Sequence, residues 1–416
     1  MKLEELDSIK MLLQHEDISN VEQGLFLWES FLEDFPSTVI ALQLLTTHTR
    51  IISAHENPIE PKEFFNWEQM TLLFEDFPHK AYISAWVLGM LASFEEIEPY
   101  LSQLSVLNLS AQDLDRLPEN IGNLSGLKEL RFERNNISEL PPSIVKLVHL
   151  ESLLCHFNRF QTIPEEVSAL KQLKKLDVSC NPIQEVPESL KELSELTTLH
   201  FWEEKNTKMP EFISHFHKLK AVGLCSKQLE RFFEALSELP KLIQLELRQN
   251  DLTSVPDNIG KLVNLEILDL SWNDVEKLPR TIGNLDQLVE LNLMDNKLTE
   301  LPEDIGQLEN LERIDLSGNR LKELPDSIVN CNNLQEIDLS WNKFHHFPKI
   351  LCQLTNLRKI LLGYNTIYFI PASIENLKNL ELLDLKNNPL CPDAEILKKL
   401  PAQVRAEVKK NFLRRK

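Results

Sequence analysis

Hydrophobic residues recur along most of the chain in a pattern with a fixed period of 23 residues. From residue 104 onward, each period follows the pattern L-x-x-L-x-L-x-x-N-x-L-x-x-L-P-x-x-I-x-x-L. A period of this length predicts a solenoid, in which each unit buries its apolar face against the next one along the chain. The thirteen units begin at Leu104, Leu127, Leu150, Leu173, Leu196, Leu219, Leu242, Leu265, Leu288, Leu311, Leu334, Leu357 and Leu380.

The positions within a unit predict its local structure. Positions 1, 4 and 6 are apolar, as in Leu265, Leu268 and Leu270, and we expect a short β-strand to point them into the core. Positions 3, 5, 7 and 8 are then expected to face the other, concave side of a sheet. Proline at position 15, first seen at Pro118, fixes φ on the convex side, where the chain needs no strand hydrogen bond.

Position 9 is asparagine in ten of the thirteen units. An amide group both donates and accepts hydrogen bonds, so it can satisfy backbone groups of its own unit and of the neighbouring one. Stacked units are therefore predicted to contain a ladder of asparagines. Its members are Asn135, Asn158, Asn181, Asn250, Asn273, Asn296, Asn319, Asn342, Asn365 and Asn388.

The 23-residue unit with its Leu-Pro pair resembles intracellular leucine-rich-repeat proteins of the plant Ras-group and Scribble types, and bacterial relatives. The resemblance covers residues 104–390. It implies an α/β fold, a horseshoe-shaped leucine-rich-repeat solenoid of thirteen repeats with a concave parallel β-sheet. It also implies scaffolding and signalling through protein contacts, with partners that differ from member to member.

The two ends of the chain lack the repeat and are predicted to be helical. In residues 1–103, the sequence Glu-Asp-Phe-Pro occurs at 33–36 and again at 75–78, each time after an amphipathic stretch. This region is either an irregular helical cap or two hairpins of the HEAT type, and a cap is needed to cover the first strand. Residues 391–416 predict a capping helix, with a basic helix on a membrane surface as the alternative.

The fifth and sixth repeats depart from the pattern. Glu204 and Lys227 replace the ladder asparagine, and Phe233 replaces the proline. Either the pattern has drifted at a tolerant place, or a flexible joint separates two rigid halves.

The net charge of −20 limits the classes of partner. An acidic body repels phosphate, so we expect no nucleic acid to bind. The acidic N-terminus does not resemble a signal peptide, and the longest apolar stretch, 81–94, is too short to span a bilayer. No two of the six cysteines form a C-x-x-C pair, which is typical of reduced, buried thiols. A cytoplasmic protein without an integral membrane segment is predicted.

No catalytic, cofactor-binding or metal-binding motif is present in the sequence, so we predict a protein that is not an enzyme. There is no phosphate-binding G-x-x-x-x-G-K-[ST] loop. His156, Cys180, His200 and Cys225 fall on four successive repeats, but their scattered positions do not converge as the ligands of a zinc ion would. They are interpreted as chance residues of a variable surface.

The concave face is the predicted binding site. Acidic residues gather at position 5 and aromatic residues at position 8, and exposed aromatic residues are typical anchors of interfaces. Aspartate at position 5 and serine at position 7 are also default residues of the resembled family. Acids beside aromatics suit lysine or arginine side chains, so a partner with a basic surface is expected. The predicted protein-binding residues are Glu246, Asp269, Trp272, Asp295, Asp315, Asp338, Trp341 and Tyr364.

The predicted function is that of a protein–protein interaction scaffold or adaptor in intracellular signalling. Two alternatives stay open. One is a secreted bacterial effector that acts on host proteins, and the other is a regulatory subunit or enzyme with an unrecognised site. The sequence does not determine the oligomeric state.

Overall fold

The structure is a computed structural model that describes residues 104–201, 211–224, 229–239, 241–390, 394–401, 404–405 and 408. Its two compact units are Met1–Leu196 and Thr197–Lys416. The predicted helical region 1–103 lies outside the described residues, as do Glu204 and Lys227, so neither the cap nor the flexible joint is tested.

Each of the thirteen repeats contains one short β-strand. Consecutive strands pair in parallel within each unit, β1 to β4 in the first and β5 to β13 in the second. The register joins equivalent positions of neighbouring repeats, for example Ile314 with Ile337. The strands are β1 (Val106–Asn108), β2 (Glu129–Arg131), β3 (Ser152–Leu154), β4 (Lys175–Asp177), β5 (Thr198–Phe201), β6 (Ala221–Leu224), β7 (Gln244–Glu246), β8 (Ile267–Asp269), β9 (Glu290–Asn292), β10 (Arg313–Asp315), β11 (Glu336–Asp338), β12 (Lys359–Leu361) and β13 (Leu382–Asp384).

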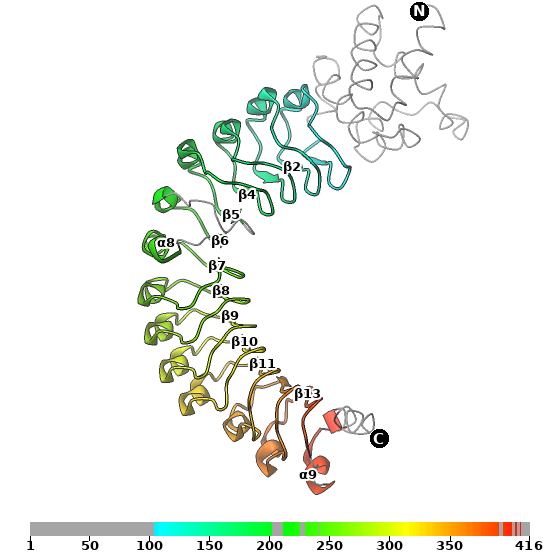
Figure 1. Ribbon diagram of the computed structural model, residues 1–416, viewed down its shortest axis with the longest axis vertical. Helices are drawn as coiled ribbons and strands as arrows, with labels where there is room; N and C mark the ends of the chain where they lie inside the picture. The colour runs from blue at the N-terminus through cyan, green and yellow to red at the C-terminus, as the bar shows by residue number, and fades with distance from the viewer. Residues whose placement is uncertain are drawn as a thin grey trace, which may run out of the picture. The chain divides into compact units, whose positions relative to one another are not determined.

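A short 3₁₀ helix follows the strand in most repeats. Where position 15 is proline, it generally lies just before this turn, as Pro302 does with φ −68° and ψ 150°. In the second unit, the strands lie on the inner side of a curved stack and the helical turns on its outer side (Figure 1). The 3₁₀ helices are η2 (Ile121–Asn123), η3 (Pro142–Lys146), η4 (Glu165–Ala169), η5 (Glu188–Glu192), η6 (Glu211–His215), η7 (Asp257–Lys261), η8 (Arg280–Asn284), η9 (Glu303–Gln307), η10 (Asp326–Asn330), η11 (Lys349–Gln353) and η12 (Ala372–Asn376).

Two repeats carry an α-helix instead. In the sixth repeat, α8 (Leu229–Leu236) replaces the 3₁₀ turn, and Phe233 is buried at the position that proline holds elsewhere. At the C-terminal end, α9 (Ala394–Lys399) packs against η12, and the Nζ atom of Lys399 lies 3.0 Å from Glu375 Oε2. Leu397 and Leu400, which belong to the segment predicted to form a capping helix, are buried.

The asparagine ladder is present, and its bonds join neighbouring repeats. The side chain of Asn319 accepts the backbone N–H of Leu298 at 2.9 Å. Its amide nitrogen donates to the carbonyl oxygens of Leu293 at 2.8 Å and Leu316 at 3.1 Å. All ten ladder asparagines are buried. The predicted parallel sheet and thirteen repeats are confirmed.

Candidate protein-binding face

Position 8 has a backbone conformation that the sequence pattern did not predict. In every repeat where this residue is described, φ is positive, between 52° and 67°. This left-handed conformation raises the free energy of a residue with a side chain by roughly 1–2 kcal/mol, and bulky residues rarely adopt it. Glycine, asparagine and aspartate tolerate the turn best, so the fold gives no reason for an aromatic residue. The residues are Ala111, Arg134, Phe157, Cys180, Gln249, Trp272, Asp295, Gly318, Trp341, Tyr364 and Asn387.

The aromatic residues at position 8 of the second unit are nevertheless prominent. Trp272 is 54% exposed and Trp341 is 59% exposed. The rings of Trp341 and Tyr364 stack in parallel, with centroids 3.7 Å apart and an angle of 9° between their planes. Trp272 belongs to the eighth repeat, three repeats before Trp341. The stack therefore makes a flat apolar patch at the edge of the strands, and Trp272 is a separate projection.

The acids at position 5 help to hold their own turns. Asp315 Oδ1 accepts the backbone N–H of Ser317 at 2.9 Å, and Asp338 Oδ1 accepts that of Ser340 at 2.8 Å. The same bond is made by Asp269 in β8 and, without a charge, by Asn292 in β9. This bond explains a polar side chain at position 5, but the negative charge is not needed for it.

Position 7, which was also predicted to face the concave side, contributes little exposed surface where it is serine. Ser271, Ser317 and Ser340 are buried beside the position 5 side chains that cap them. We therefore define the inner face as the surface formed by positions 3, 5 and 8 of the second unit. Glu246, the first of the predicted acids, lies half-buried in β7, where Gln244 donates a hydrogen bond to it.

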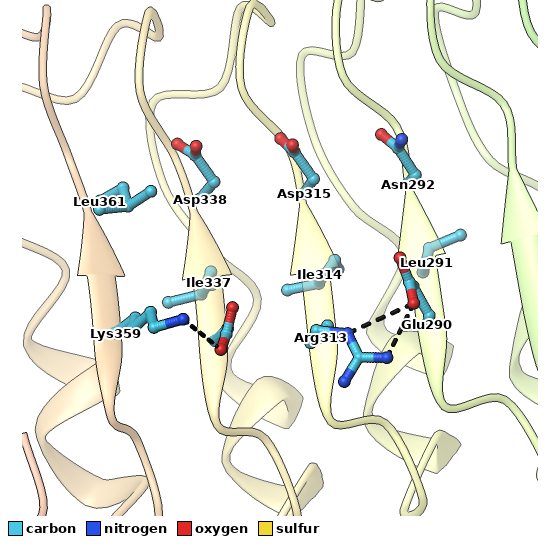
Figure 2. Close-up of a pocket in the computed structure, with 11 residues that line it drawn as sticks. Glu290, Leu291, Asn292, Arg313, Ile314, Asp315, Ile337, Asp338, Lys359 and Leu361 are labelled. Carbon is cyan, nitrogen blue, oxygen red and sulfur yellow. Dashed lines mark hydrogen bonds and ion pairs between the residues drawn. The ribbon is translucent and has the colours of Figure 1, made fainter. Parts of the chain in front are cut away.

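Position 3 contributes a row of ion pairs that the sequence pattern did not predict. Arg313 donates to Glu290 Oε2 at 2.8 Å, and Lys359 donates to Glu336 Oε1 at 2.7 Å. The bond to Glu290 also raises the pKa of Arg313. Both pairs cross between neighbouring strands (Figure 2). The sequence does contain a signal for these pairs, because the charge at position 3 alternates in sign over four successive repeats, at intervals of 23 residues.

These ion pairs line a shallow depression of about 220 Å³ over β9 to β12. In Figure 2, Asn292, Asp315 and Asp338 form a row that runs above the two ion pairs. The depression is smaller than a typical small-molecule site of about 300–1,000 Å³. It is large enough for one or two side chains of a partner.

Three acids of the inner face, Asp295, Asp315 and Asp338, have no ion-pair partner among the described residues. Burial raises the pKa of Asp295 and of Asp338, and the nearby charge of Asp315 raises both further. In the part of the chain that the structure describes, none of these three carboxylates forms an ion pair with a lysine, arginine or histidine. These three carboxylates therefore present negative charge that no direct ion pair with a described residue neutralises.

The first unit shows a different arrangement on and just after its strands. Arg134 lies over the ring of Phe157, with its Cζ atom 5.4 Å from the ring centroid. His156 Nδ1 lies 3.4 Å from Asp177 Oδ2. Within the described residues, no group of three histidine, cysteine or acidic side chains could hold a metal ion, and Cys225 lies outside them.

The described cysteines are Cys155, Cys180, Cys331 and Cys352, all free thiols, and only Cys180 is not fully buried. Burial raises the pKa of Cys331 to about 12, so this thiol is not a nucleophile near neutral pH.

No described helix is long and apolar enough to cross a membrane.

Comparisons with known proteins agree with this geometry. The family model described as "Leucine-rich repeat region" matches residues 225–317, and "Leucine Rich Repeat" matches 172–193, 310–331 and 333–354. A leucine-rich-repeat protein of Leptospira interrogans is 28% identical, with a TM-score of 0.59 over 77% of this chain and 84% of that one. The chain belongs to the leucine-rich-repeat superfamily.

Other similarities of this leucine-rich-repeat protein are more distant or partial. An internalin of Listeria monocytogenes shares the fold at 18% identity, with a TM-score of 0.63 over 80% of this chain and 95% of that one. The plant peptide hormone receptor RGFR1, solved in complex with RGF2, is 28% identical, with a TM-score of 0.51 over 70% of this chain and 53% of the receptor.

A curated relative matches a short segment. The TMV resistance protein N of Nicotiana glutinosa is 45% identical over 67 residues, which are 16% of this chain. The match spans only 6% of the length of that relative.

Proposed function

We propose that this leucine-rich-repeat protein is an interaction scaffold or adaptor that binds a protein partner on the inner face of its second unit. The fold is typical of protein–protein interaction domains. A cytoplasmic location and a role in signalling, without catalysis, belong to the same proposal.

The observation that supports it most is the exposed aromatic stack. Trp341 and Tyr364 occupy backbone positions with positive φ, where aromatic side chains raise the energy of the folded chain. Trp341 also leaves more than half of its surface in water. A side chain that is unfavourable for the turn and for solvation is accounted for by contact with a partner, where tryptophan and tyrosine are the commonest anchors.

The charge of the inner face indicates the chemistry of the partner. The lysine and arginine of the depression are already bound to Glu336 and Glu290. Asp295, Asp315 and Asp338 have no such cation among the described residues, so a partner with a basic surface would be attracted to them. Nucleic acid does not fit this charge.

Affinity capture with two matched triple variants tests the proposal. The inner variant combines Asp315→Asn, Asp338→Asn and Trp341→Ala, and the control combines Glu303→Gln, Glu309→Gln and Phe369→Ala. Each removes two carboxylates and one exposed aromatic ring. We expect a protein that wild type and the control retain and the inner variant loses. A partner lost only by the control would place the binding surface elsewhere.

The charge alone has a smaller, kinetic effect. Asp315→Asn with Asp338→Asn keeps the side-chain oxygens that accept the backbone N–H groups but removes two negative charges. We expect the association rate with a captured basic partner to fall about threefold at low ionic strength, because steering by the acids is lost. The difference should shrink as salt rises. Stopped-flow measurement at two salt concentrations checks this, and equal rates at low salt would contradict it.

A further inference from the structure

The chain itself shows what one side of the aromatic stack accepts. Beyond Tyr364, on the side of the thirteenth repeat, the Nζ atom of Lys386 lies 5.8 Å from the centroid of the tyrosine ring. The same nitrogen lies 3.1 Å from Asp384 Oδ2, and this carboxylate raises the pKa of the lysine. A cation, an aromatic ring and a carboxylate are thus combined on this side.

The other side of the stack borders a residue without a side chain. Because one face of Trp341 lies against Tyr364, its opposite face is directed toward the tenth repeat. There, position 8 is Gly318, whose N–H donates to the carbonyl oxygen of Ser340 at 2.9 Å. Gly318 is therefore the neighbour of Trp341 in the tenth repeat, and it has no side chain that could cover the free face of the indole.

A carboxylate lies over this glycine. Gly318 has φ +67°, and a methyl group in the place of its side chain would lie 2.1 Å from Asp295 Oδ1. Asp295 reaches this place from position 8 of the ninth repeat. Burial and the charge of Asp315 both raise its pKa and so act against its ionisation. The carboxylate and the aromatic face that accompany Lys386 on one side are thus repeated on the other, but without an ion pair to Asp295 in the described chain.

We propose that a site beside Gly318, formed by the carboxylate of Asp295 and the free face of Trp341, binds the guanidinium group of an arginine side chain of the protein partner. We name it the arginine slot. A guanidinium group is flat, so it can extend the stack of Tyr364 and Trp341 as a third layer, while its N–H groups reach the carboxylate of Asp295. An ammonium group has the charge but not the flat shape. The inference rests on the proposed function, because it names the partner side chain that the inner face recognises.

Small probes test the slot without the partner. The full chain, labelled with ¹⁵N at the tryptophan indoles, is titrated with acetyl-arginine amide, acetyl-lysine amide and acetyl-citrulline amide. Citrulline has nearly the shape of arginine but no charge. Trp341→Phe assigns the indole signal of Trp341. We expect saturable movement of this signal with arginine and binding at least about fivefold weaker with lysine and with citrulline.

Two further controls are within the same protein. The indole of Trp272 has the same repeat position and borders Asp295 from the other side, but the carboxylate of Asp295 leans toward Gly318, so the signal of Trp272 should move less than that of Trp341. Asp295→Asn preserves the shape of the slot and should weaken arginine binding at least about fivefold, because the charge-assisted hydrogen bonds are lost. Equal binding of arginine and citrulline, equal movement of both indole signals, or no effect of Asp295→Asn would each overturn the proposal.

The slot and the proposed function fail in different ways. If the arginine probe does not bind but Trp341→Ala still weakens the partner, the slot is wrong and the inner face remains the binding surface. If the probe binds as expected but Trp341→Ala leaves the partner unaffected, the arginine slot exists and the partner binds elsewhere.

Discussion

Replacing Trp341 with alanine is expected to weaken the binding of the captured partner at least about tenfold, because truncated aromatic anchors typically cost about 2 kcal/mol or more. The free energy of unfolding should change by only about 1 kcal/mol, since the stack on Tyr364 is an exposed contact between two rings. Isothermal titration calorimetry and urea unfolding measure the two quantities on the same variant.

Phe369→Ala is the matched control for this result. Phe369 is 65% exposed and belongs to the same repeat as Tyr364, but it lies next to η12 instead of on the inner face. We expect its removal to leave the affinity within about twofold of wild type, as for most surface residues outside an anchor. If Trp341→Ala binds as tightly as Phe369→Ala, the aromatic stack is not the anchor.

The largest effect on stability is expected from Asn319→Ala. The amide of Asn319 bonds to backbone groups of two repeats in a buried place. In the alanine variant the N–H of Leu298 loses this partner, whereas the carbonyl oxygens of Leu293 and Leu316 each lose one bond and keep one, from Asn296 and Asn342. Since a buried unpaired group costs about 1–3 kcal/mol and each of the two other lost bonds about 0.5–1.5 kcal/mol, we expect a loss of at least about 2 kcal/mol in the free energy of unfolding. Urea unfolding followed by circular dichroism measures it.

Asn310→Ala provides the comparison for the ladder residue. Asn310 also bonds to the neighbouring repeat, donating to the carbonyl oxygen of Asp286 at 2.8 Å, but the bond is exposed. Water can replace it, so a change of only about 0.5 kcal/mol is expected. Similar losses for the two variants would mean that the ladder does not stabilise the stack as described.

The repeat period determined most of what could be predicted about the fold. A leucine at each of positions 1, 4 and 6 can be buried in only one register, and Ile314 does pair with Ile337, 23 residues later. The ladder was predictable because an asparagine that recurs at a bend can pair with the backbone groups that the bend leaves without strand partners. The α-helix in the sixth repeat was not predicted, although Phe233 in place of proline removed the residue that precedes the 3₁₀ turn elsewhere.

The arrangement of side chains on the inner face was less predictable. The sequence indicated acids and aromatics there, but it did not indicate that Trp341 and Tyr364 stack on each other. The positive φ of position 8 could have been inferred from Gly318, Asp295 and Asn387, because glycine, aspartate and asparagine tolerate that conformation. The ion pair of Arg313 with Glu290 depends on which position 3 residues become neighbours, and the period of 23 would have given that pairing.

Hydroxyl-radical footprinting of the complex tests the central claim most directly, since one sample reports on aromatic residues of different surfaces. The exposed rings of Trp341 on the inner face and of Tyr368 and Phe369 near η12 serve as probes. If the partner binds the inner face, oxidation of Trp341 and Tyr364 should fall several-fold on binding, while oxidation of Tyr368 and Phe369 stays unchanged. Protection of Tyr368 and Phe369 with no change at Trp341 would contradict the account.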